Sequence, residues 1–207
     1  MKQLISQIKS LQNSSINNIV DQRLLEFSSF SNKSEEEWFS ELCFCILAAN
    51  SRQKTAEAIQ KQISIEKLDK MAEKEFANLI RANKHRFHNN KAKYIKSALE
   101  FKNIKTIIKD KNEVSAREWL VNNVRGLGYK EASHFLRNTG SQNLAILDRH
   151  ILNLMQDNKI IEKPKTLTKN HYLNIEEEFI SISNILKMSP AKLDLFMWYL
   201  KTGEVLK

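Results

Sequence analysis

The chain has 207 residues, and its 33 Lys and Arg against 24 Asp and Glu give a formal net charge of +9. Hydrophobic residues make up 42% and charged residues 28%, values that are ordinary for a folded domain and exclude global disorder. Only 4 glycines and 2 prolines are present, where average usage would give roughly 14 and roughly 10. This scarcity disfavours a β-sandwich, a barrel or a multi-strand α/β fold and indicates an all-α protein.

The predicted elements are all helices. Apolar residues recur at three- and four-residue steps, the period of one helix face, over 1–30, 35–49, 55–63, 65–71, 72–82, 88–101, 103–109, 114–122, 130–138, 148–157, 172–188 and 190–202. Ser34 and Glu37 have the spacing of a capping box at the start of the segment over 35–49. We expect 1–207 to form a single unit, with its only candidate boundary near 110–114.

Cys43 and Cys45 lie two residues apart in the apolar segment over 35–49. This spacing is too short for a comfortable disulfide, so we expect buried thiols in a reducing compartment. The cysteine count excludes a four-cysteine zinc or iron–sulfur site within this chain, and the histidines show no metal-ligand spacing. No apolar run approaches the ~18 residues of a transmembrane helix, and residues 1–8 lack a signal-peptide core. We expect a cytoplasmic protein that contacts no membrane.

Positive charge is concentrated between Arg81 and Lys109. Nine basic residues and one acidic residue, Glu100, lie in this stretch, a surplus of eight positive charges. A concentrated patch of this kind favours a polyanionic partner such as nucleic acid, bound through salt-dependent phosphate contacts. The alternative is an ordinary lysine-rich surface exposed to solvent.

Residues 114–139 have the pattern of two helices joined by a tight turn. The turn contains Gly126, Leu127 and Gly128, so half of the glycines of the chain lie in it. Glycine tolerates positive φ and lets the backbone approach another surface closely, and N–H groups at a helix start bind anions. The pattern predicts a helix-hairpin-helix motif, which grips the DNA backbone without reading sequence.

Lys130 and Asp148 are the candidate reactive residues. Lys130 begins the second helix of the hairpin, where the helix dipole and burial in a cleft would both favour a neutral, nucleophilic amine. Asp148 follows an apolar run and precedes a helix, so it can cap that helix and present a carboxylate. Taken singly, Lys130 reads as an exposed helical lysine and Asp148 as an N-cap; only the joint pattern favours chemistry.

Three segments carry a resemblance to a known family: 128–138 (GYKEASHFLRN), 146–152 (ILDRHIL) and 193–199 (LDLFMWY). They are similar to the archaeal-type (type 2) 8-oxoguanine DNA glycosylase/AP lyases of the helix-hairpin-helix glycosylase superfamily. The resemblance extends over 36–47 and 85–87, and Leu127 and Leu147 stand where isoleucine is more usual. It implies two helical subdomains that flank a DNA-binding cleft, and no cofactor.

The resemblance implies a mechanism for these residues. The damaged nucleotide is flipped into a pocket, and Lys130 attacks C1′, displaces the base and forms a Schiff base from which β-elimination cuts the strand. Asp148 would stabilise positive charge on the sugar. The N–H groups of Gly126, Leu127 and Gly128 would hold phosphate, with Arg149 as a further backbone contact.

The resemblance also implies residues that recognise the base. Lys207 is expected to help distinguish 8-oxoguanine from guanine, Trp198 to stack on the flipped base, and Asp194 to accept a base N–H. Phe87 and Asn50 are weaker candidates for contacts to the base or to the gap that it leaves.

Two alternatives to a bifunctional 8-oxoguanine glycosylase stay open at this point. One is a helix-hairpin-helix module that grips DNA without chemistry, which would need neither Lys130 nor Asp148. The other is a glycosylase for a different oxidised base, such as a pyrimidine. For the glycosylase we expect duplex DNA that contains 8-oxoguanine as the partner, a nucleoid-associated monomer, and no required protein partner or metal.

Overall fold

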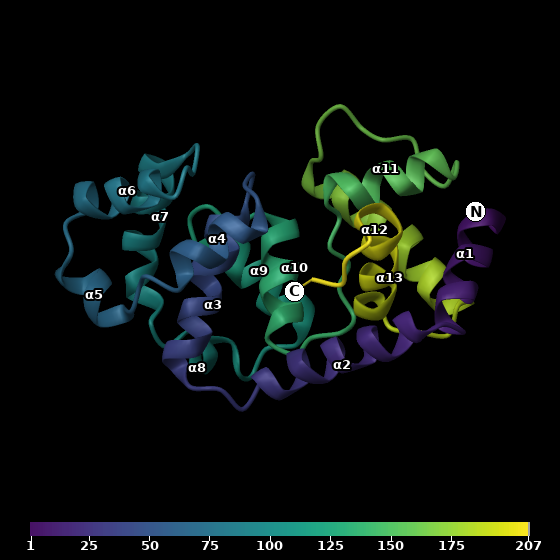
Figure 1. Cartoon of the computed structure of the whole chain (residues 1–207), viewed down its shortest axis with the longest axis horizontal. Coiled ribbons are helices and arrows are strands. Elements are labelled where there is room, and N and C mark those ends of the chain that lie inside the picture. Colours follow the sequence, from purple (N-terminus) through teal and green to yellow (C-terminus); the bar gives the residue numbers. More distant parts are fainter. Residues whose placement is uncertain (207) are drawn as a thin grey trace. The chain divides into compact units, whose positions relative to one another are not determined.

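The computed structural model describes residues 1–206 as thirteen α-helices and one 3₁₀-helix, with no strand in that range (Figure 1). The all-α prediction is therefore confirmed. The chain divides into two compact units, of which unit 1 combines Met1–Ser31 with the chain from Arg137 onward and unit 2 is Asn32–Leu136. The divisions fall at these positions and not near 110–114, where Asn112 caps the helix over Glu113–Asn123 by accepting from the Ser115 N–H.

Unit 2 contains most of the residues predicted to bind the DNA backbone. Its elements are α3 (Glu35–Ala48), α4 (Gln53–Gln60), α5 (Ile65–Lys70), α6 (Glu73–Ala82), α7 (His88–Ala98), η1 (Leu99–Phe101), α8 (Ile104–Ile108), α9 (Glu113–Asn123) and most of α10 (Tyr129–Asn138). Helix α3 is its centre, because it contacts α4, α5, α7 and α8 and its side chains from Leu42 to Leu47 are fully buried. The rings of Trp38 in α3 and Phe135 in α10 pack edge to face at 5.9 Å.

Unit 1 contains the remaining candidate residues. Its helices are α1 (Lys2–Gln12), α2 (Ser15–Phe30), α11 (Arg149–Asp157), α12 (Lys169–Ile185) and α13 (Pro190–Thr202), together with the end of α10. Helix α13 is the centre of this unit, since it contacts α1, α2, α11 and α12. Its residues Leu193, Phe196 and Met197 are fully buried.

Local signals explain where the helices begin. The predicted capping box is confirmed: the Ser34 side chain accepts from the Glu37 N–H, and the Glu37 carboxylate accepts from the Ser34 N–H at 2.9 Å. The single helix expected over 1–30 is wrong, because Ser14 accepts from the Ile16 N–H and starts α2 as a separate helix. Thr168 caps α12 in the same way, so α12 begins three residues before the predicted Tyr172.

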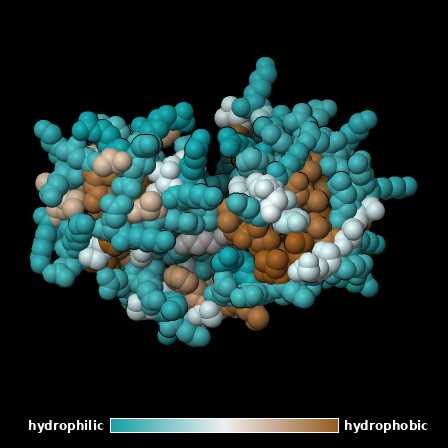
Figure 2. Space-filling model, in the orientation of Figure 1, coloured by the Kyte–Doolittle hydropathy of each residue, from teal (hydrophilic) through white to brown (hydrophobic). Residues whose placement is uncertain are grey.

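The surface and the thiols agree with an ordinary folded domain. Hydrophilic residues dominate the face shown in Figure 2. Large apolar side chains that are exposed occur in scattered places, of which Leu25 is the most open at 70%. Both cysteines are free and buried, as predicted, and burial raises the pKa of the Cys43 thiol, which makes it unreactive. Within residues 1–206 no helix combines the length and the apolar character that a membrane span requires.

Candidate functional site

The hairpin of unit 2 is built by α9, a glycine turn and α10. Gly126 has a φ of +89°, in the region that favours glycine, and the turn closes through a 3.3 Å hydrogen bond from the Leu127 N–H to the Val124 carbonyl. A Cβ at Gly126 would lie 2.4 Å from Cδ2 of Tyr94, so the aromatic ring of α7 packs directly on the turn. The glycine is therefore required by the backbone conformation and by this close approach.

The turn presents fewer free amides than the sequence predicts. The Leu127 N–H is used inside the turn, and the Leu127 side chain is buried. Within residues 1–206 the N–H groups of Gly126 and Gly128 make no hydrogen bond, and both glycines are exposed. Gly126 and Gly128 are thus the two amides of this turn that a phosphate could use, whereas Leu127 anchors the turn.

Contacts between α9 and α10 fix the start of α10, where Lys130 lies. The Tyr129 hydroxyl donates to Oε1 of Glu118 at 2.5 Å, and the guanidinium of Arg117 lies 5.3 Å from the centre of the Tyr129 ring. Arg117 is itself 1% exposed and donates to the Ser133 hydroxyl. The backbone that carries Lys130 is therefore held by side chains on both of its sides.

Lys130 itself is accessible. Its side chain is 25% exposed, and its ammonium lies 3.7 Å from Oε1 of the neighbouring Glu131. The Glu131 carboxylate also folds back toward the turn, since a Cβ at Gly128 would lie 3.3 Å from Oε2 of Glu131. Lys130 thus combines an open approach with an acidic neighbour that the sequence analysis did not consider.

Phe87 is presented to solvent by a buried histidine. His85 is 3% exposed, its Nδ1 accepts from the Phe87 N–H at 3.1 Å, and its Nε2 lies 2.9 Å from the Leu47 carbonyl. Burial lowers the pKa of His85, which favours the neutral ring that this pair of contacts requires. Phe87 is 37% exposed, with the guanidinium of Arg86 at 4.7 Å over its ring.

Asn50, the other weak candidate in this unit, is exposed at a φ of +58° directly after the C-cap of α3.

In unit 1, Asp148 is the N-cap of α11. Its Oδ1 accepts from the N–H groups of His150 and Ile151, each at 2.8 Å. No hydrogen bond to Oδ2 is present within residues 1–206, so the carboxylate caps the helix with one oxygen and keeps the other available. The two readings of Asp148 from the sequence, a cap and a charge in the site, are therefore compatible.

His150 connects Asp148, Arg149 and Trp198. The rings of His150 and Trp198 pack edge to face with centres 5.1 Å apart, and Arg149 donates from Nε to Nε2 of His150. The Trp198 Nε1 is buried without a hydrogen-bond partner in the described part of the chain. Unit 1 therefore brings Asp148, Arg149 and Trp198 together.

Asp194 has a different environment from the one expected. It is 4% exposed, and its Oδ2 accepts from the guanidinium of Arg137 at 2.5 Å. Arg137 also holds the Asn138 side chain and stacks over the Phe27 ring at 4.8 Å. In this arrangement Asp194 ties α13 to the end of α10, and its contact with a base stays a prediction. Lys207 lies outside the described residues.

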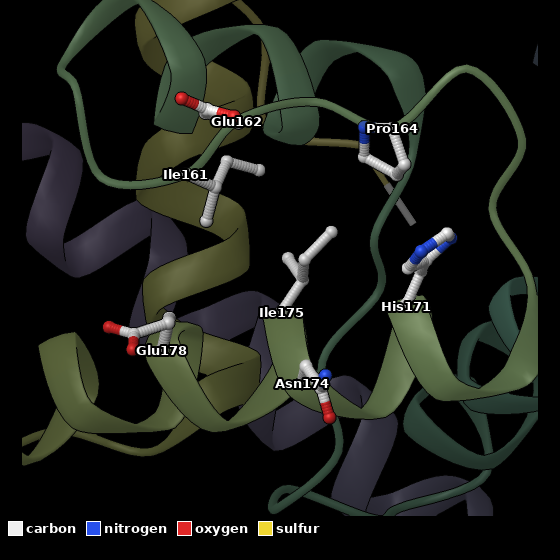
Figure 3. Close-up of a pocket in the computed structure, with 7 residues that line it drawn as sticks. All are labelled: Ile161, Glu162, Pro164, His171, Asn174, Ile175 and Glu178. Carbon is white, nitrogen blue, oxygen red and sulfur yellow. The ribbon is translucent and has the colours of Figure 1, made fainter.

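A cavity of about 320 Å³ opens elsewhere in unit 1 and contains none of the predicted site residues. Its lining comprises Ile161, Glu162, Pro164, His171, Asn174, Ile175 and Glu178 (Figure 3). Two carboxylates on its wall do not suit a DNA phosphate. Within residues 1–206 no group of three or more His, Cys, Asp or Glu is placed to hold a metal ion.

Lys91, one of the nine basic residues between Arg81 and Lys109, is only 5% exposed and was not predicted to be buried. Charges on Glu131 and Lys130 act on it, so it belongs to the surroundings of the predicted nucleophile. A signal was available, because Lys91 shares the helical period of the buried residues Ile95 and Ala98. Lysine is seldom found at such a buried position.

Comparisons with known proteins agree with this arrangement. The family model for 8-oxoguanine DNA glycosylase matches residues 20–188. The 8-oxoguanine DNA glycosylase/AP lyase of Methanocaldococcus jannaschii is 49% identical over 206 residues, which cover 99% of both chains. The fold is similar to the crystal structure of the M. jannaschii enzyme in complex with a 15mer DNA containing 8-oxoguanine, with a TM-score of 0.95, 47% identity and coverage of 99% of this chain and 100% of that chain.

A more distant likeness concerns the fold alone. A non-covalent endonuclease III–DNA complex matches with a TM-score of 0.58 at 15% identity, over 89% of this chain and 83% of that chain. The helical architecture therefore agrees with the helix-hairpin-helix glycosylase fold that the sequence resemblance implies.

Proposed function

The chain belongs to the 8-oxoguanine DNA glycosylase/AP lyase family, and from this membership we propose that it excises 8-oxoguanine from duplex DNA and cuts the strand at the resulting abasic site. The observation that carries the proposal is the 49% identity over 99% of both chains. The accessible lysine just after the hairpin turn supports it, because a DNA clamp without chemistry needs no such residue.

Lys130 is the nucleophile in this proposal. Its neutral amine forms a bond to C1′ of the flipped nucleotide while the glycosidic bond breaks, and the base leaves after it gains a proton. Opening of the sugar gives a Schiff base between Lys130 and C1′. Loss of a proton from C2′ then expels the 3′ phosphate, which is the β-elimination that cuts the strand. The position of Lys130 at the start of α10, where its side chain is partly exposed, supports this role.

Asp148 acts through its charge. Positive charge develops on the sugar as the base departs, and a fixed carboxylate nearby stabilises it more than it stabilises the neutral substrate. Oδ1 accepts hydrogen bonds from two backbone N–H groups, and these bonds hold the carboxylate in one orientation. This preorganisation means that little rearrangement is needed during the reaction.

The DNA backbone is held by the N–H groups of Gly126 and Gly128 and by Arg149. None of these groups reads sequence, which suits an enzyme that must find a lesion in any sequence context. For the base we propose Trp198, Phe87 and Lys207 as contacts. The exposed ring of Phe87 supports its proposed contact with the base. Asp194 has less support as a base contact than these three residues, because its carboxylate already binds Arg137.

We further propose that the enzyme works as a monomer on chromosomal DNA in the cytoplasm. All the residues proposed for binding and chemistry come from one chain, so the reaction as written requires no second subunit. Light scattering of the free protein and of its DNA complex tests this point, and a complex of two chains per duplex would contradict it.

The function is tested with matched duplexes that carry one 8-oxoguanine or one guanine opposite cytosine. We expect release of the oxidised base and a β-elimination product only from the lesion duplex, and we expect Lys130→Gln to give neither while it still binds the duplex. Cleavage of a duplex with an oxidised pyrimidine in preference to 8-oxoguanine would change the substrate. Binding with no cleavage of any lesion or abasic duplex would identify a DNA clamp.

A further inference from the structure

The segment that leads to Asp148 is buried but has no regular secondary structure. Each of the residues 144–147 is at most 5% exposed, and none of them belongs to a helix or a strand. Backbone N–H and C=O groups that are buried in this way cost free energy if they have no hydrogen-bond partner. The segment therefore needs partners from other elements.

Two side chains of α12 supply these partners. The Tyr172 hydroxyl donates to the Ala145 carbonyl at 2.7 Å and accepts from the Leu147 N–H at 3.4 Å. Oε1 of Glu176 accepts from the Ala145 N–H at 3.0 Å. Tyr172 and Glu176 lie four residues apart and so share one face of α12. This face thus holds the backbone of the segment at residues 145 and 147.

The polar atoms of these two side chains are buried together with the segment. Tyr172 is 2% exposed and Glu176 is 5% exposed. A hydroxyl or a carboxylate is costly to bury unless it is hydrogen-bonded, and an apolar side chain could fill the same volume. What Tyr172 and Glu176 add to apolar packing is a fixed location for the backbone of residues 145–147.

Asp148 is held from both of its sides. Its N–H donates to the Ile146 carbonyl at 3.0 Å, so its backbone continues directly from the segment that Tyr172 and Glu176 hold. On the other side its Oδ1 accepts from the first N–H groups of α11. The place of its carboxylate therefore depends on α12 as well as on α11.

We propose that Tyr172 and Glu176 are positioning residues for Asp148, which keep its carboxylate where positive charge develops on the sugar. Neither residue needs to touch the substrate, because each acts through the backbone of residues 145–147. A fixed charge stabilises a transition state only while it keeps its place, and a displacement of about 1 Å can lower a rate ~100-fold. The inference rests on the proposed function, since it assigns a role relative to Asp148 in base release.

The test is single-turnover release of 8-oxoguanine from a duplex at saturating enzyme, where the rate does not depend on DNA affinity. Tyr172→Phe removes the hydroxyl and keeps the ring. It is measured alone and together with Asp148→Asn, because a residue that acts only through Asp148 has nothing to position once the carboxylate charge is gone. Ser183→Ala is the matched control, since it removes another buried hydroxyl of α12, which donates to the Ile180 carbonyl of the same helix at 2.8 Å.

We expect Tyr172→Phe to release the base roughly tenfold more slowly than wild type, a smaller loss than the ~100-fold that a full displacement can cost, because Glu176 still holds the segment. In the Asp148→Asn background the same substitution should change the rate by less than about twofold. Ser183→Ala should release the base at the wild-type rate. Thermal unfolding of each variant sets a temperature at which all of them are folded.

Glu176→Leu repeats the comparison at the second contact. It removes the acceptor of the Ala145 N–H and keeps an apolar side chain of similar size. The same pattern is expected, with a slower release than wild type and no further loss in the Asp148→Asn background. This variant decides the matter if Tyr172→Phe does not fold.

Three results would overturn the inference: a normal rate in Tyr172→Phe, an equal loss with and without the Asp148 charge, or a normal rate in Asp148→Asn. An equal loss would mean that Tyr172 only supports the fold of unit 1. Failure of the proposed function is distinguishable, because a wild-type protein that releases no 8-oxoguanine would overturn both. If wild type is active and Asp148→Asn is slow, a negative result concerns the positioning residues alone.

Discussion

Asp148 carries two tasks on one side chain. One oxygen of its carboxylate caps α11 through two hydrogen bonds, and its charge is the feature that the chemistry requires. Asparagine and aspartate are about equally good N-caps. The two tasks can therefore be separated by a substitution that keeps the cap and removes the charge.

We predict that Asp148→Asn is as stable as wild type but releases 8-oxoguanine at least ~100-fold more slowly, the scale expected when one electrostatic group is lost from an active site. Single-turnover base release and thermal unfolding measure the two properties. Asp148→Ala is the matched control, because it removes the cap as well and should cost a further ~1 kcal/mol of stability. A normal rate in Asp148→Asn would remove the charge from the mechanism.

For single residues, the sequence predicts which side chains belong to the candidate site better than it predicts what those side chains contact. Lys130 and Asp148 stand out because the hairpin and the segment 146–152 frame them. The pairing of Asp194 with Arg137 joins residues 57 positions apart, and no local pattern encodes such a contact. The burial of Lys91 was missed for the same reason, since it depends on the packing of α7 against α6 and α3.

At the scale of the element, the hairpin depends on one close contact. The turn reaches a φ of +89° at Gly126 and packs against the Tyr94 ring. Sequence patterns predicted the turn and both of its helices, because glycine spacing and helical period are local properties. The partner of the turn could not be predicted, since Tyr94 belongs to a helix more than 30 residues away.

We predict that Gly126→Ala destabilises the protein by about 2–4 kcal/mol and weakens DNA binding. Positive φ accounts for about 1–2 kcal/mol of this loss, and the forced shift of Tyr94 accounts for the rest. Gly203→Ala controls for the first term, because Gly203 has a φ of +73° with nothing within 4 Å of an added Cβ. Equal losses of stability in the two variants would show that the Tyr94 ring moves aside without destabilising the protein.

At the scale of the whole molecule, the charge between Arg81 and Lys109 is less uniform than the sequence indicates. Lys96 donates to the carbonyls of Leu68 and Met71, Lys102 pairs with Asp69, and Lys105 donates to the Lys33 carbonyl. Lys91 is buried. Lys84, Arg86 and Lys93 are exposed and stay available for phosphate contacts.

We predict that Lys93→Gln lowers the slope of log affinity for duplex DNA against log salt concentration by about 0.9, the value for one phosphate contact. Lys102→Gln should leave this slope unchanged, because the Lys102 ammonium of the wild-type protein already pairs with Asp69. Fluorescence anisotropy between low and moderate salt measures both slopes. Equal slopes in wild type and Lys93→Gln would show that this exposed lysine meets no phosphate.

The all-α class and the family could be predicted from the sequence, since helical period, glycine scarcity and the three matching segments all lie in it. The division into two units could not be predicted in the same way. It joins the first 31 residues to the end of the chain, and only tertiary packing decides which distant segments share a core. The break at Ser14 was missed although no apolar residue lies between Leu11 and Ile16, where the stretch 12–15 (QNSS) interrupts the period.

The most direct test of the account is borohydride trapping on a duplex with one 8-oxoguanine opposite cytosine, with an undamaged duplex and Lys130→Gln as controls. A covalent protein–DNA adduct is predicted for the wild-type protein on the lesion duplex alone, because only a Schiff base at Lys130 can be reduced to a stable bond. An adduct of equal yield in Lys130→Gln, or no adduct despite normal binding of the lesion duplex, would contradict it.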